Sequence, residues 1–377
     1  MISEPHPPAA SANPAASSAG LFDVRPQAEE RLHPRFRMLR HRADLAPARD
    51  LVLELHAKAL GDAQPGHVEE FRTGDFDAAL FRLFLFALFD DAGHCIDIRN
   101  HEPDFVLSKG GTTAAVDALT VGIPSSGVTE PRTATTSPMG AMQASGAGSG
   151  LVGKLQGRQW CLPCVAGHPF VIAIQDFDHA AMPRGAPPGA LLHFLFGGSD
   201  PAQDLDDLFP KGFFGQQDAE HVSAILFCND ATIAKFNRLG QQRQPAGAAR
   251  MLRHGACLSD DGAVSASTGY IYEVGRKGAH IETWNEGTVL IHNPRAVQPL
   301  PANWLGAAAE LEFSDGRIVE RFATGFHPIS SHTELFGSDI PAWWVERRME
   351  LLERECAAHH SEHVHSPELR PPRAARK

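Results

Sequence analysis

The sequence contains no long uninterrupted hydrophobic run. Its longest apolar stretch, Ala78 to Phe89, is broken by Arg82 and is shorter than the roughly 20 residues that cross a bilayer. Residues 1–20 also lack the basic and apolar segments of a signal peptide. Because they are rich in Ala, Pro and Ser, they are expected to form a disordered tail. These features predict a cytoplasmic protein without a membrane partner.

Cysteine and positive charge are both scarce. Six cysteines in 377 residues are too few for a disulfide framework and fit a reducing compartment. The 34 Lys and Arg residues are outnumbered by 45 Asp and Glu residues, which gives a net charge of −11. This balance argues against a protein that grips nucleic acid by overall charge. It leaves room for a protein that holds a phosphate through one local basic groove and a metal ion.

Five of the arginines lie between Arg31 and Arg42. This basic cluster is a candidate phosphate-contacting arm and predicts a nucleic-acid partner. The alternative is a solvated segment whose arginines pair with nearby acids. Nothing in the sequence indicates an oligomeric state.

The residue pattern predicts a mixed α/β chain. Residues 76–91 are apolar on nearly every side of a helix, with Asp75 as N-cap and Gly93 at the C-terminal end, so this helix is expected at the centre of a domain. A second helix is predicted over 47–60. Residues 170–174 form a continuous apolar run, typical of a strand buried on both faces. The segment 122–150 is expected to be a loop, with a short helix over 151–159.

A hairpin between these elements carries a pair of acids. Gly110 and Gly111 separate two alternating apolar runs, which is the signal of a two-residue turn. Paired positions then sum to 221, and this register places Asp104 opposite Asp117 on one face of the sheet. Like charges about 5 Å apart repel, and a bound divalent cation such as Mg²⁺ or Mn²⁺ would relieve that repulsion. A longer turn with another register would instead leave one acid in solvent.

The order of these elements resembles the PD-(D/E)XK nuclease superfamily. Pro103-Asp104 matches its PD element and Asp117 matches its second acid. Pro103–Phe105, Asp117–Thr120 and Gly167–Ile174 are together similar to segments of a group of bacterial proteins. The resemblance implies a restriction-endonuclease-like core with a mixed sheet in residues 21–180. Residues 181–356 would add an α+β C-terminal half, and residues 357–377 a second disordered tail.

The resemblance also implies roles for individual residues. Asp104 and Asp117 would be the metal ligands. The lysine that usually follows the second acid by two positions is replaced by Leu119, so Lys154, or less favourably Lys109, would take its place. An auxiliary acid often found on the preceding helix would be supplied by Asp77 or Glu70, because the middle polar residue of that helix is Arg82.

Two other motifs compete for these residues. Gly148 to Lys154 nearly matches a phosphate-binding loop, but Leu155 replaces the required hydroxyl residue and no buried strand precedes it. Cys161 and Cys164 lie in a Trp-Cys-x-Pro-Cys sequence, but a strand follows where redox chemistry needs a helix. A flexible linker and two structural thiols are the simpler interpretations.

The leading hypothesis is therefore a metal-dependent, nuclease-like protein that hydrolyses phosphodiester bonds. Asp104, Asp117, Lys154 and Asp77 would form its catalytic set. The alternative is a catalytically inactive scaffold that keeps the nuclease-like core to bind nucleic acid or a protein partner. A lysine or arginine close to the Asp104–Asp117 pair would favour the first hypothesis.

Overall fold

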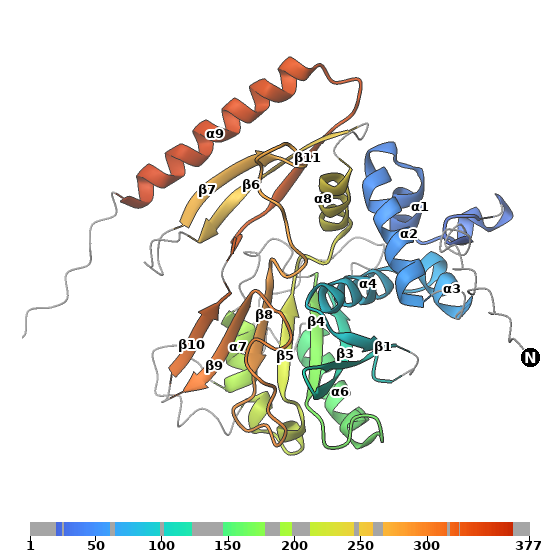
Figure 1. The fold of residues 1–377 in the computed structure, drawn as a ribbon, viewed down its shortest axis with the longest axis vertical. Coiled ribbons are helices and arrows are strands. Elements are labelled where there is room, and N and C mark those ends of the chain that lie inside the picture. The colour runs from blue at the N-terminus through green and yellow to red at the C-terminus, as the bar shows by residue number, and fades with distance from the viewer. Residues whose placement is uncertain are drawn as a thin grey trace, which may run out of the picture.

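The fold is taken from a computed structural model. It describes residues 20–24, 26–60, 65–98, 102–122, 146–177, 189–197, 212–244, 249–258, 267–314, 317–323 and 325–364. The architecture is mixed α/β: the described chain begins with a run of helices, and a run of strands precedes the last helix (Figure 1). Among these residues, no helix combines the length and apolar character needed to span a bilayer. The predicted tail of residues 1–20 lies almost wholly outside the described residues.

Five of the eight α-helices of the described residues lie in the first half of the chain. Their bounds are α1 (Pro34–His41), α2 (Ala46–Leu60), α3 (Pro65–Thr73), α4 (Phe76–Asp91), α6 (Gly146–Gly157), α7 (Gly189–Phe196), α8 (Ile233–Arg243) and α9 (Ala342–Val364).

The strands form two sheets. An eight-stranded mixed sheet has the order β1-β2-β3-β4-β5-β8-β9-β10, and a three-stranded antiparallel sheet has the order β11-β6-β7. Their bounds are β1 (Cys95–Asp97), β2 (Phe105–Lys109), β3 (Thr112–Val121), β4 (Phe170–Asp176), β5 (Ala224–Cys228), β6 (Arg250–Leu258), β7 (Ser267–Glu273), β8 (Thr288–His292), β9 (Ala309–Ser314), β10 (Arg317–Phe322) and β11 (His332–Phe336).

The centre of the large sheet is covered on both faces. Strands β3, β4 and β5 run parallel, and every residue of β4 is buried, as the continuous apolar run predicts. Alternate side chains of β4 enter two separate cores, one with α4 and α2 and the other with α6 and α7. Residues 21–180 and part of the C-terminal half therefore share one sheet.

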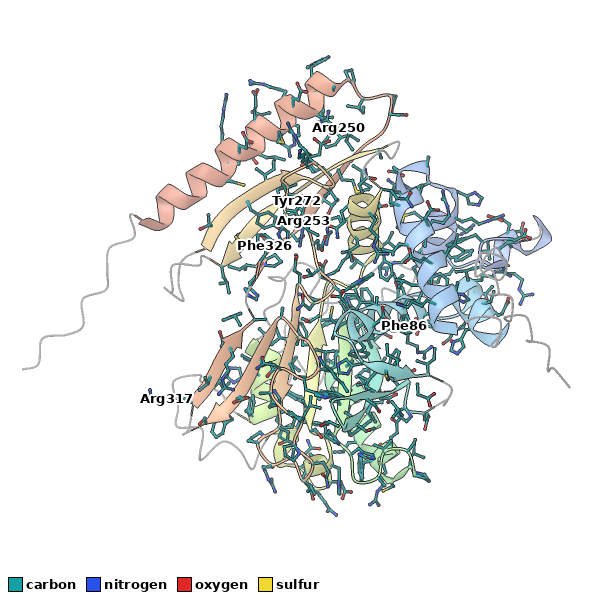
Figure 2. The ribbon with its side chains drawn as sticks, in the orientation of Figure 1. Phe86, Arg250, Arg253, Tyr272, Arg317 and Phe326 are labelled. Carbon is teal, nitrogen blue, oxygen red and sulfur yellow. The ribbon has the colours of Figure 1, made fainter. Side chains whose placement is uncertain are left out.

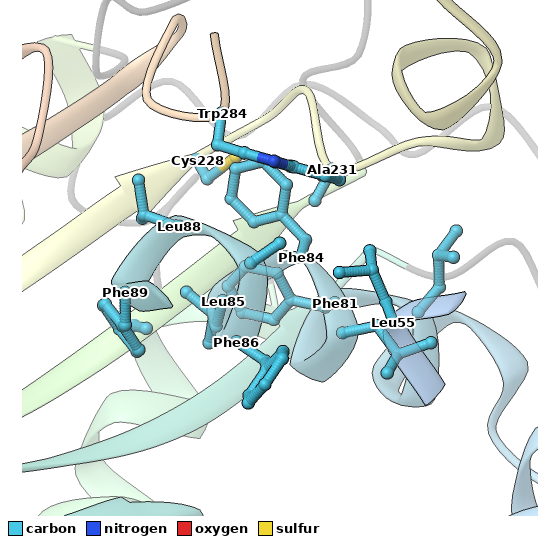
Figure 3. Close-up of a cluster of buried hydrophobic side chains, with 14 of the residues drawn as sticks. Leu55, Phe81, Phe84, Leu85, Phe86, Leu88, Phe89, Cys228, Ala231 and Trp284 are labelled. Carbon is cyan, nitrogen blue, oxygen red and sulfur yellow. The ribbon is translucent and has the colours of Figure 1, made fainter. Parts of the chain in front are cut away.

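Helix α4 is the central helix of the first core. Twelve of its sixteen residues are buried, and Asp75 caps it by accepting a hydrogen bond from the Ala78 N–H at 3.1 Å. Phe84 contacts Trp284 edge-on at 5.9 Å, while Phe86 points to another side of the helix (Figure 3). The predicted bounds, N-cap and central burial of this helix are confirmed.

The three-stranded sheet is the part of the C-terminal half that stands apart from the large sheet (Figure 1). Helix α9 covers one face of it, where Val345 and Leu352 pack with Leu252 and Phe336. Helix α8 contacts α2, and the Pro47 carbonyl approaches Gly240 so closely that a Cβ there would lie 2.2 Å from its oxygen. A side chain at Gly240 would therefore separate the two helices.

Two sequence-based boundaries were wrong. Helix α6 begins at Gly146, inside the segment 122–150 predicted as a loop, because Ala147, Leu151 and Leu155 recur every four residues and are buried together in the second core. Residues 123–145 of that loop lie outside the described residues. Helix α9 continues to Val364, although residues 357–377 were predicted to be disordered. No Pro or Gly interrupts it before Pro367.

Candidate functional site

The predicted hairpin register is confirmed. Phe105 pairs with Val116 and Lys109 with Thr112, so each pair sums to 221. Gly110 and Gly111 both have positive φ, at 58° and 80°, as a two-residue type I′ turn requires. The turn chemistry therefore sets the relative position of the two acids.

Asp104 precedes β2 directly and lies beside Asp117 of β3. Its Oδ2 accepts a hydrogen bond from the backbone N–H of Ala118 at 2.8 Å, so the side chain reaches across the hairpin. The side chain of Asp117 is only 3% exposed and that of Asp104 is 14% exposed. Two carboxylates from neighbouring strands thus meet at a site that is largely closed to water.

Lys154 of α6 lies beside this pair of carboxylates. Its Nζ lies 2.5 Å from Oδ2 of Asp117. Gly150, one helical turn earlier, lets α6 approach β3, because a Cβ there would lie 2.9 Å from both δ-methyls of Leu119. Leu119 follows Asp117 by two residues, so its side chain lies on the same face of β3 and packs against α6. Lys154 of that helix supplies the amine beside Asp117.

Arg82 of α4 forms a second cationic contact. Its Nε lies 2.8 Å from Oδ1 of Asp104, and its Nη1 donates a hydrogen bond of 2.9 Å to Oε1 of Glu70 in α3. The other carboxylate oxygen of Glu70 lies 3.6 Å from Nδ1 of His67. A polar chain therefore runs from α3 through the middle of α4 to Asp104. Sequence reasoning missed this role of Arg82, although it is the single charge in the central apolar run of α4.

The electrostatics of the site are unbalanced. Burial raises the pKa of Asp117 to about 6; attraction to Lys154 opposes this rise and repulsion by Asp104 adds to it. Three carboxylates, those of Glu70, Asp104 and Asp117, face the two fixed cations Arg82 and Lys154. The site is therefore one positive charge short when all three acids are ionised and His67 is neutral.

Asp77 lies elsewhere in the structure. Its buried carboxylate forms a 2.5 Å ion pair with Nη1 of Arg35, whose guanidinium lies 5.4 Å from the ring centre of Phe177. Glu70, the other candidate auxiliary acid, is the one that reaches Arg82. The amine of Lys109 donates to the Ala92 carbonyl at 2.8 Å, at the turn end of the hairpin.

The N-terminal basic cluster is partly neutralised. Arg35 pairs with Asp77, Arg40 with Glu29 and Arg42 with Asp44. Phe36 and Leu39 of the same segment are buried in the first core. Arg31 and Arg37 are exposed. The cluster is therefore largely a folded, ion-paired segment, and its contact with nucleic acid stays a prediction.

A buried charge network links α8 to the smaller sheet. Arg238 donates through Nε and Nη2 to both carboxylate oxygens of Glu282 at 2.7 and 2.8 Å, and Nη1 of Arg253 donates to Glu286 at 2.9 Å. Arg253 is fully buried, and it lies near Tyr272 and Phe326 between the two sheets (Figure 2). Lys235, Asn237 and Arg238 of α8 are all buried in the interior.

Two further groups bring acids and histidine together among the described residues, Asp218–Glu220–His221 and His292–Glu310–Glu312. Other contacts already engage several of their members. Oε1 of Glu310 accepts a hydrogen bond from the Asn303 N–H at 2.9 Å, Glu312 pairs with Arg321, and the ring of His221 stacks on Trp160. Neither group includes a predicted site residue.

Comparison with known proteins adds no assignment. No protein-family model, curated protein or solved structure matches the chain.

Proposed function

We propose that the chain is a metal-dependent nuclease that hydrolyses phosphodiester bonds at Asp104 and Asp117. One observation carries the proposal: two facing carboxylates from adjacent strands meet the amine of Lys154, 2.5 Å from Asp117. The restriction-endonuclease-like organisation of the core belongs to the same proposal. A lysine beside the acid pair is the feature that favours catalysis over an inactive scaffold.

The residues fit a divalent cation such as Mg²⁺ or Mn²⁺. Asp104 and Asp117 offer the carboxylate oxygens that such hard cations prefer, and Glu70 is a third acid on the same polar chain. Oδ2 of Asp117 is buried and lies 2.5 Å from the ammonium of Lys154, so a cation bound there would share this oxygen with Lys154 or displace its ammonium. When bound, the cation would supply the missing positive charge, lower the pKa of a water ligand and neutralise charge on the phosphate.

The basic side chains have different roles in this proposal. The side chain of Lys154 is 26% exposed, so its ammonium can contact a phosphate or a water next to Asp117. Arg82 is bound by Glu70 and Asp104 and orients the Asp104 carboxylate. Lys154 is therefore the proposed catalytic cation, and Arg82 is a positioning residue.

Cleavage assays on single-stranded and duplex DNA and RNA, with Mg²⁺, Mn²⁺ or EDTA, test the proposal. Wild-type protein should cleave at least one substrate in a metal-dependent manner, and Asp117→Asn should lower the rate at least 100-fold, of the order that loss of one electrostatic catalytic group causes. Asp90→Asn is the matched control. Asp90 lies on α4 and, like Asp117, forms an ion pair with a lysine, but its partner Lys58 and the pair itself are exposed. Binding without cleavage by the wild type would support the inactive scaffold instead.

A further inference from the structure

A pocket opens on the α4 side of the Asp104 site. Its volume is about 270 Å³, and it lies between α2, α3, α4 and the start of β2. Apolar side chains form most of its wall, chiefly Phe71, Leu83, Phe86 and Phe105. The volume is below the 300–1,000 Å³ usual for drug-sized ligands, so the pocket suits one small ring system.

One edge of this pocket is polar and leads to the proposed metal site. His67, Glu70, Arg82 and Asp104 all line it, and they are the members of the polar chain described above. The guanidinium of Arg82 contacts two carboxylates, so this edge carries no excess positive charge. Such a lining disfavours an anion inside the pocket and favours a neutral ligand with hydrogen-bonding groups.

His56 also lines this pocket. The residue is 6% exposed, and its Nε2 is buried without a hydrogen-bond partner among the described residues. Burial lowers the pKa of His56, and the positive charges of His67 and Arg72 lower it further. A neutral imidazole can act as donor or acceptor at Nε2, according to its tautomer. His67, Glu70 and Arg82 are each about one third exposed, so the polar edge of the pocket can form hydrogen bonds with the edge of a flat heterocycle.

We propose that this pocket binds one unpaired nucleobase of the strand whose phosphate lies at Asp104 and Asp117. Unpaired bases are recognised by stacking on aromatic side chains and by hydrogen bonds to their edges, which are the two features that Phe86 and the polar edge of the pocket offer. A base inside a duplex is stacked and paired and cannot enter a pocket, so the substrate is single-stranded or has a base displaced from its duplex. This inference depends on the proposed nuclease function and adds its substrate class.

Calorimetric titration of the full chain with each of the four deoxynucleosides, in EDTA, tests the pocket independently of catalysis. At least one nucleoside should bind the wild type. Ala59→Phe, which fills the pocket, should weaken that binding at least tenfold, and His67→Ala, which removes a hydrogen-bonding group from its polar edge, should weaken it at least fivefold. Glu54→Phe is the matched control, because it places the same ring on an exposed part of α2 and should leave binding unchanged.

Cleavage assays in Mn²⁺ with the same variants separate the two proposals. Preference for a single strand over a duplex, lost in Ala59→Phe, supports the base pocket. Nucleoside binding that Ala59→Phe removes, without cleavage of any substrate, overturns the nuclease proposal and leaves a base-binding pocket. Cleavage with no nucleoside binding, and equal rates for wild type and Ala59→Phe, overturns the pocket assignment alone. Folding of each variant is checked by thermal denaturation.

Discussion

Asp104 accepts a hydrogen bond from the backbone N–H of Ala118, the residue that follows Asp117. This 2.8 Å contact connects the first acid to the strand that carries the second. The Gly110-Gly111 turn sets the same register from the other end of the hairpin. Two independent local interactions therefore hold the carboxylates together despite their mutual repulsion.

The raised pKa of Asp117 predicts a cost in stability at neutral pH. Its folded-state pKa of about 6 exceeds the ordinary value of 3.8, so the folded protein holds the proton more tightly than the unfolded chain. Stability from this group is lost as pH rises from about 4 to 6, and above that range the ionised form costs on the order of 3 kcal/mol. Asp117→Asn should therefore raise the unfolding free energy of the metal-free protein at pH 7.5, with a smaller gain at pH 4.5. Urea denaturation at both pH values measures this, and destabilisation at pH 7.5 would contradict it.

A lysine placed on the neighbouring strand should restore part of the cleavage rate that is lost when Lys154 is replaced. Lys154→Met removes the amine beside Asp117 and should lower the cleavage rate at least 100-fold. Leu119 lies two residues after Asp117 and packs under Gly150, so Leu119→Lys in the same background supplies an amine from β3 instead. We expect the double variant to recover at least tenfold of the lost rate in single-turnover assays. No recovery, with both variants folded, would argue against exchange of the amine between these positions.

The buried network around Arg253 predicts a large stability effect. Arg253→Met leaves Glu286 and Glu282 without one of their charged partners in the interior, and breaking such a buried pair typically costs 3–5 kcal/mol. Arg348→Met is the matched control, because its partner Glu334 is about one quarter exposed and surface pairs contribute roughly 0–1 kcal/mol. Chemical denaturation compares the two. Equal effects would show that the network does not stabilise the packing of the smaller sheet.

The sequence pattern predicted those elements that are determined by residues adjacent in the sequence. Helix α4 and its Asp75 cap follow from a run of adjacent apolar residues, and the hairpin register follows from two glycines. The start of α6 was missed because Gly146, Gly148 and Gly150 have low helix propensity, and only burial against β3 and β4 overrides it.

Contacts between residues far apart in the sequence could not be predicted from the local sequence pattern. The Arg82 bridge joins α3 to a hairpin more than thirty residues further along the chain, and no periodicity signals it. Strands β6, β10 and β11 were missed as well; β6 and β11 carry many polar side chains and pair across about 80 residues. The interior position of Arg238 likewise depends on Glu282, which lies 44 residues away.

Mn²⁺ titration by calorimetry tests the central claim most directly, because it measures the proposed metal site without requiring a substrate. Asp104→Asn removes one carboxylate charge while its amide oxygen can still accept the Ala118 hydrogen bond, so the hairpin should persist. We predict saturable Mn²⁺ binding to the wild type and to the control Asp90→Asn, and a loss of affinity of at least tenfold in Asp104→Asn. Equal heats for wild type and Asp104→Asn, with neither cleaving nucleic acid, would contradict the account.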